Sequence, residues 1–147
     1  MEISFFVPGI PEPGGSKKGF FSPKLKRVII TDANPKAKGW KASVAQAAAE
    51  VAGQVTPEMM FGPLKVRMDF VFPRPKGHYG TGKNEGKIRD SAPQYPTVRP
   101  DAGKVARSTE DALTGILWKD DSQIVTEILT KRYGPIPGCT ITVRPEA

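Results

Sequence analysis

Apolar and charged residues alternate most regularly between positions 64 and 70. The order there is Leu64, Lys65, Val66, Arg67, Met68, Asp69 and Phe70. A period of two is that of a strand with one buried face. The segment therefore predicts a half-buried β-strand, and it is the clearest strand signal in the chain.

Shorter β-rich runs predict further strands. Residues 3–7 stop at a Pro-Gly pair, which favours an edge or first strand. Residues 19–21 and 27–30 flank a proline-containing turn with basic residues, the pattern of a hairpin. Residues 124–130 and 139–143 are separated by a second Pro-Gly-rich link. We expect these last two runs to form a final hairpin.

Two segments have helical spacing instead. Asn34 is a capping residue followed by proline, and apolar side chains recur with a helical period until Gly53. This predicts a first helix over 35–52. Asp101 is a candidate N-cap for a second helix over 102–114.

Residues 73–100 have neither pattern and contain repeated Pro, Gly and basic residues. Loops of this length are uncommon in compact domains and are usually functional or disordered. We therefore expect a mobile basic loop that contacts the substrate. The order of elements predicts an α+β fold, a small mixed β-sheet with two main helices, in a single domain over residues 1–147.

The distribution of charge along the chain indicates the kind of partner that the protein binds. The chain has 147 residues with 22 Lys and Arg against 15 Asp and Glu, a net charge of +7. Residues 1–41 and 62–100 are strongly basic, whereas residues 101–147 carry slightly more acid than base. Basic segments give sequence-independent affinity for phosphate, so nucleic acid is the leading partner. A solvated basic surface is the alternative.

The sequence predicts neither a membrane span nor a disulfide bond. No apolar run approaches the roughly 18 residues of a membrane span, and the N-terminal residues lack a signal-peptide pattern. We expect a cytoplasmic protein with no membrane partner. A single Cys139 and a single His78 cannot form a disulfide or a Cys/His zinc site, so any metal here needs oxygen ligands.

Acidic residues gather late in the chain. Asp101 precedes the second predicted helix, Glu110-Asp111 lies within it, and Asp120-Asp121 follows it. A strand that turns back along this helix would bring the two ends together. Clustered carboxylates repel one another unless a cation lies between them, and Mg²⁺ uses carboxylates, water and phosphate oxygens. Capping of Asp101 and a turn at Asp120-Asp121 are the alternative explanation.

The same region resembles a known family. Residues 99–107 read Arg-Pro-Asp-Ala-Gly-Lys-Val-Ala-Arg, Asp-Ala-Leu follows at 111–113, and residues 118–125 read Trp-Lys-Asp-Asp-Ser-Gln-Ile-Val. These stretches are similar to the Pro-Asp-x-Asp-[Asn/Lys]-Leu, Asp-Ala-Leu and Asp-Asp-x-Gln-Val motifs of the RusA-type Holliday junction resolvases, particularly their phage branch. Residues 74–79 with residues 82–84, and residues 7–9, are similar to segments of the same branch.

This resemblance implies a homodimeric, Mg²⁺-dependent endonuclease of DNA recombination and repair, with Mn²⁺ as a substitute metal. It would cut a four-way DNA junction at two symmetry-related strands. By motif, Asp101 and Asp121 would be metal ligands, and Asp120 would share the catalytic doublet. The resemblance and the charge pattern together suggest a set of DNA contacts, which comprises Lys104, Arg107, Lys76, Lys83, Lys87 and Arg99.

One position departs from the family motif. Gly103 stands where the second aspartate of the motif would be, and the loss of a carboxylate weakens the expected metal site. Glu110 or Asp111 could contribute if the helix faces suitably. The alternatives are a RusA-like DNA-binding protein with weakened or lost nuclease activity, and a basic structural or interaction protein.

Overall fold

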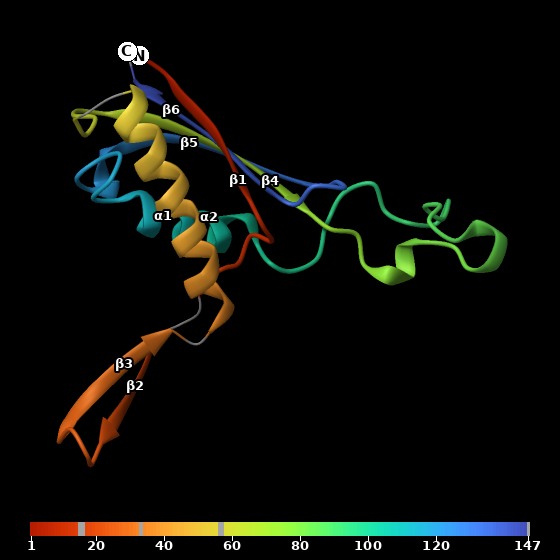
Figure 1. The fold of residues 1–147 in the computed structure, drawn as a ribbon, viewed down its shortest axis with the longest axis horizontal. Coiled ribbons are helices and arrows are strands. Elements are labelled where there is room, and N and C mark those ends of the chain that lie inside the picture. The colour runs from red at the N-terminus through yellow and green to blue at the C-terminus, as the bar shows by residue number, and fades with distance from the viewer. Residues whose placement is uncertain (15–16, 33, 56–57, 147) are drawn as a thin grey trace.

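Two helices cover one face of a four-stranded sheet, and two extensions project from this body (Figure 1). The computed structural model describes residues 1–14, 17–32, 34–55 and 58–146. The sheet consists of β1 (Ile3–Pro8), β4 (Leu64–Phe72), β5 (Ile124–Tyr133) and β6 (Gly138–Pro145). The helices are α1 (Lys36–Val55) and α2 (Ala102–Leu113). This confirms the predicted α+β class with a mixed sheet and two main helices.

β4 occupies the interior of the sheet. Its alternate residues from Leu64 to Phe72 are buried against the helices, as the period of two predicts. The strand order is β1-β6-β4-β5, with β4 antiparallel to β6 and parallel to β5. β1 pairs with β6 and is an edge strand, which confirms that prediction.

The expected final hairpin is wrong, because β4 lies between β5 and β6. The connection from β4 to β5 runs through α2 and is long enough to make these two strands parallel neighbours. The short link 134–137 then passes the end of β4, where the N–H of Gly134 donates to the carbonyl of Phe72 at 3.1 Å. β4 therefore has a hydrogen-bonded strand along each of its two edges.

The helices share one core with the sheet. Trp40 and Val44 of α1 and Val105 and Leu113 of α2 are buried in the same cluster as the β4 side chains. Both predicted helices are confirmed within a few residues, although α1 continues two residues past Gly53. That glycine has open space around its Cβ position and costs the helix only about 1 kcal/mol relative to Ala.

The two extensions correspond to the predicted hairpin and the predicted basic loop. Strands β2 (Lys17–Ser22) and β3 (Arg27–Asp32) pair antiparallel and point away from the body in Figure 1. Residues 73–100 extend from another side and contain two short 3₁₀ turns, η1 (Lys76–His78) and η2 (Gly82–Asn84). Backbone hydrogen bonds such as Arg89 N–H to His78 O (2.8 Å) order this loop internally. Its mobility stays a prediction.

Within the described residues, no helix combines the length and apolar character that a bilayer crossing requires.

Candidate active site

Asp101 lies at the start of α2 with its side chain exposed. It has the N-cap position, but it makes no side-chain hydrogen bond to the helix. Its carboxylate instead lies 3.8 Å from the ammonium group of Lys104, and both side chains are about two-thirds exposed. Capping therefore does not explain this aspartate, and its carboxylate is available to another group.

The Asp120-Asp121 doublet divides into two roles. Asp120 precedes the short turn η3 (Asp121–Gln123) and caps it, because its carboxylate accepts from the N–H of Ser122 at 2.9 Å. This hydrogen bond holds the pKa of Asp120 below its usual range. Gln123 completes the cap by accepting from the backbone N–H of Asp120 at 3.0 Å. A turn thus accounts for Asp120, while Asp121 begins η3 as an exposed side chain.

A carboxyl pair lies beside the C-terminal half of α2. Glu110 is half-buried and shares a hydrogen bond with Glu127 of β5. Burial, this bond and the negative charges of Glu127, Asp121 and Asp111 raise the pKa of Glu110 to about 8. At neutral pH the pair therefore holds a proton. Sequence reasoning missed Glu127, although it follows the same alternation as the core-facing Leu129.

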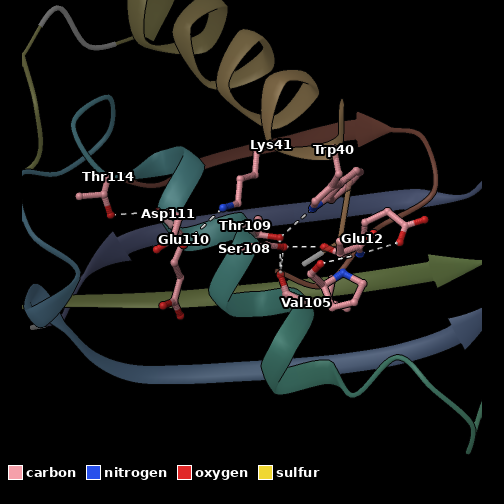
Figure 2. A network of polar contacts seen from close by, with 11 residues as sticks. Glu12, Trp40, Lys41, Val105, Ser108, Thr109, Glu110, Asp111 and Thr114 are labelled. Carbon is pink, nitrogen blue, oxygen red and sulfur yellow. Dashed lines mark hydrogen bonds and ion pairs between the residues drawn. The ribbon is translucent and has the colours of Figure 1, made fainter. Parts of the chain in front are cut away.

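Polar contacts on the opposite side of α2 fix which way the helix faces (Figure 2). Trp40 Nε1 donates to Thr109 Oγ1 at 3.1 Å, and Ser108 Oγ donates to the carbonyl of Glu12 at 2.6 Å. Lys41 lies 3.7 Å from Asp111. In Figure 2 the Glu110 side chain points away from α1 and Lys41. Glu110 is thereby directed to the side where β5 runs.

The two expected metal ligands lie at opposite ends of α2. Glu110 comes nine positions after Asp101, about 13 Å along a helix axis. Asp121 acts electrostatically on Glu110 and so lies near the C-terminal end of the helix. β5 does turn back along α2, but it is Lys131 that returns to the helix start, where its ammonium donates to the carbonyls of Val98 and Pro100 at 3.0 Å each.

A single chain therefore does not assemble the expected cluster. Across the described part of the chain, no three His, Cys, Asp or Glu residues are grouped so that they could hold a metal ion. The oxygen donors are present, but they form one set at each end of α2.

Exposed cations surround the helix and continue along the loop. Arg107 is exposed on α2, and Gly103 lies four residues earlier on the same side of the helix, with nothing within 4 Å of its Cβ position. The remaining predicted DNA contacts are also exposed, and these are Lys76, Lys83, Lys87 and Arg99. None of these side chains belongs to the core, so the basic surface is free to meet phosphate.

Three other residues, His78, Cys139 and Trp118, pack against other parts of the protein. His78 packs edge-on against Tyr133 with ring centroids 5.2 Å apart, at the base of the loop. Cys139 is a buried residue of the core, and this burial raises the pKa of its thiol. Trp118 is fully buried in the core.

These features describe a small basic α+β protein with exposed carboxylates next to cations. Residues 12–144 match the family Endodeoxyribonuclease RusA, and the chain belongs to that family. The chain is also similar to the uncharacterized protein YqaN of Bacillus subtilis (strain 168). The two are 31% identical over 143 residues, which cover 97% of this chain and 95% of YqaN.

Membership confirms the resemblance found in the sequence. At the level of the family, the chain is a Holliday junction resolvase-like endodeoxyribonuclease, and the family acts on branched DNA junctions.

Proposed function

We propose that this protein is a Mg²⁺-dependent endonuclease that resolves four-way DNA junctions by paired phosphodiester hydrolysis, with Mn²⁺ as a substitute metal. The observation that carries the proposal is the state of Asp101. It occupies the motif position at the start of α2, yet its carboxylate caps nothing and lies exposed beside Lys104. A carboxylate with no structural role next to a cation suits contact with a metal and a phosphate.

The separation of Asp101 from Asp121 favours a site shared between two copies of the chain. β5 is an edge strand, with no strand on its outer side among the described residues. Antiparallel pairing of two β5 edges would set the start of one strand against the end of the other. Since Lys131 ties the end of β5 to Pro100, this pairing brings Asp121 of the partner subunit toward Asp101.

Charge along β5 supports this pairing. Its start carries acid, with Asp121 just before the strand and Glu127 within it, whereas its end carries Lys131 and Arg132. Antiparallel association would therefore bring the acidic half of one strand alongside the basic half of the other at both symmetric positions. Opposite charges across neighbouring strands each contribute roughly 0.2–1 kcal/mol. The homodimer and its two equivalent sites follow from one interface.

The carboxyl pair fits the same site. Glu110 and Glu127 lie on the Asp121 side, and their mutual repulsion is the kind that a cation relieves. Asp101 of one chain and Asp121 of the partner subunit would hold the metal, and a carboxylate of the pair beside Asp121 would take the place of the one that Gly103 lacks. Bound Mg²⁺ supplies an activated water and stabilises charge on the leaving oxygen. Lys104 and Arg107 would orient the phosphodiester beside it.

The test uses two inactive variants together. We expect Asp101→Asn and Asp121→Asn each to lose Mg²⁺-dependent cleavage of a synthetic four-way junction while retaining binding. When the two variants are mixed and allowed to exchange subunits, each heterodimer has one site with both lesions and one intact site. The mixture should then nick one strand of the junction.

Two results would argue against this arrangement. Full activity of either single variant would remove that aspartate from the metal site. The other result is that both single variants are inactive and their mixture stays inactive, although differently tagged chains show that subunits have exchanged. This result would place both aspartates of a site in one chain. Incubation of wild-type protein with EDTA serves as the metal-free control.

A further inference from the structure

A pocket of about 190 Å³ lies where the basic loop joins the sheet. Phe72 and Tyr133, at the ends of β4 and β5, line it together with Ile10 from the N-terminal segment. Eight of its ten lining side chains are apolar or aromatic, and the other two are the cations Arg99 and Lys131. The pocket thus combines apolar walls with positive charge and has no acidic lining residue.

The pocket adjoins the candidate active site through the backbone. One wall is Val98, Arg99 and Pro100, and Asp101 is the next residue. The ammonium of Lys131 holds this wall in place, because it donates to the carbonyls of Val98 and Pro100 at 3.0 Å each. A ligand group in the pocket is therefore close to whatever Asp101 contacts.

Contacts from the loop also hold the Tyr133 side of the pocket. The guanidinium of Arg74 lies 4.6 Å from the centroid of the Tyr133 ring and donates to the carbonyl of Pro93 at 2.7 Å. His78 packs against the edge of the same ring. These contacts anchor the base of the loop, so the pocket is formed before any ligand binds. Preformed sites bind with a smaller loss of conformational freedom.

Its apolar surface is left open to solvent. Ile10 is 52% exposed and Val98 is 62% exposed, although both line the pocket. Exposed apolar groups that are gathered around a hollow mark a binding site more often than scattered ones do. The volume is below that of pockets for drug-sized ligands, about 300–1,000 Å³, and suits a single flat ring system.

We propose that this pocket receives one unstacked base of the DNA strand, next to the phosphodiester held at Asp101. This inference rests on the proposed function. The apolar walls match the faces of a base, and the exposed Arg99 matches a phosphate next to it. At a branch point a strand passes from one arm to another, so a base there can lack one stacking neighbour, which lowers the cost of unstacking it. The pocket would then select which phosphodiester near the branch is cut.

The experiment pairs pocket variants with junctions that lack one base. A series of four-way junctions carries a single abasic nucleotide at successive positions around the branch, and Ca²⁺ replaces Mg²⁺ during binding measurements. At one position, we expect removal of the base to weaken wild-type binding about tenfold. Val98→Trp fills the pocket and should bind the intact junction about tenfold more weakly, with no further weakening on the abasic junction.

Two further variants make the result specific. Ile10→Trp fills the pocket from the other wall and should reproduce the Val98→Trp pattern. Ile136→Trp adds the same side chain at a 66% exposed position outside the pocket and should behave as wild type. Val98 and Ile10 are themselves exposed, so thermal unfolding should show that both variants are folded.

The outcomes separate the two proposals. Suppose that the wild-type protein cuts intact junctions, but that the effects of the pocket variants and of base removal on binding are additive at every position. This result would overturn the base pocket and leave the proposed function in place. A change in self-association of Val98→Trp with unchanged DNA binding would make the pocket a protein interface and overturn the inference. Wild-type protein that neither binds nor cuts a junction would overturn both.

Discussion

The carboxyl pair of Glu110 and Glu127 makes the stability of this protein depend on pH in a direction opposite to that of most carboxylates. The pKa of Glu110 rises from 4.5 to about 8 in the folded protein. A carboxyl group with a raised pKa is protonated more readily when folded than when unfolded. Its contribution to stability is therefore complete below about pH 4.5 and is lost as the pH rises through about 8.

The magnitude follows from the size of this shift. Each pKa unit corresponds to about 1.4 kcal/mol, but Glu110 is only half-buried and solvent screens part of the interaction. We therefore expect an effect of about 1–2 kcal/mol at pH 9. Glu110→Gln keeps the shape and the hydrogen-bonding capacity of the protonated side chain without its titration.

Urea unfolding at pH 5, 7 and 9 checks this prediction. Glu110→Gln should match wild type at pH 5 and exceed its free energy of unfolding by about 1–2 kcal/mol at pH 9. Glu50→Gln, at an exposed position on α1, is the matched control and should follow wild type throughout. If Glu110→Gln and wild type differed by the same amount at all three pH values, the shared proton would not exist.

Three further predictions concern the site and its surroundings. Lys83→Ala combined with Lys87→Ala should weaken binding to all DNA shapes, and the slope of log affinity against log salt should fall by about 0.9 for each phosphate that is no longer neutralised. Fluorescence anisotropy across a salt series measures this slope. An unchanged slope would show that both lysines contact only solvent. Asp120→Asn keeps a capping side chain and should retain cleavage, whereas Asp121→Asn should lose it; equal loss on a synthetic junction would give Asp120 a chemical role. Gly103→Ala should raise the free energy of unfolding by about 0.5–1 kcal/mol. Gly103→Asp should in addition raise the affinity for Mg²⁺, which titration calorimetry measures. Equal Mg²⁺ affinity in the two variants would place position 103 outside the metal site.

Local elements of this fold could be predicted because each depends on neighbours in sequence. The alternation from Leu64 to Phe70 specified β4, and the capping residue and apolar spacing specified α1. The end of α1 was less predictable, because an exposed Gly53 costs too little to stop a helix that is held by its buried face.

Pairing between distant segments could not be predicted in the same way. The short link from β5 to β6 resembles a hairpin turn, but the two strands pair with opposite edges of β4, and no local pattern indicates which edges pair. The relation of Asp101 to Asp121 depends on where β5 begins relative to α2, which no local pattern contains. For Glu127, the alternation indicated which face it shares, but not that Glu110 lies opposite.

β6 lies between β1 and β4 in the sheet, although it follows both of them in the chain. During synthesis, β1 and β4 emerge first and have no direct partner in each other. Until residues 138–145 leave the ribosome, β4 therefore exposes one unpaired edge alongside a row of apolar side chains. Open edges of this kind promote association between chains. A chain truncated before β6 should accordingly depend on chaperones or be degraded, because β1 and β4 are joined into one sheet only after β6 has been synthesised.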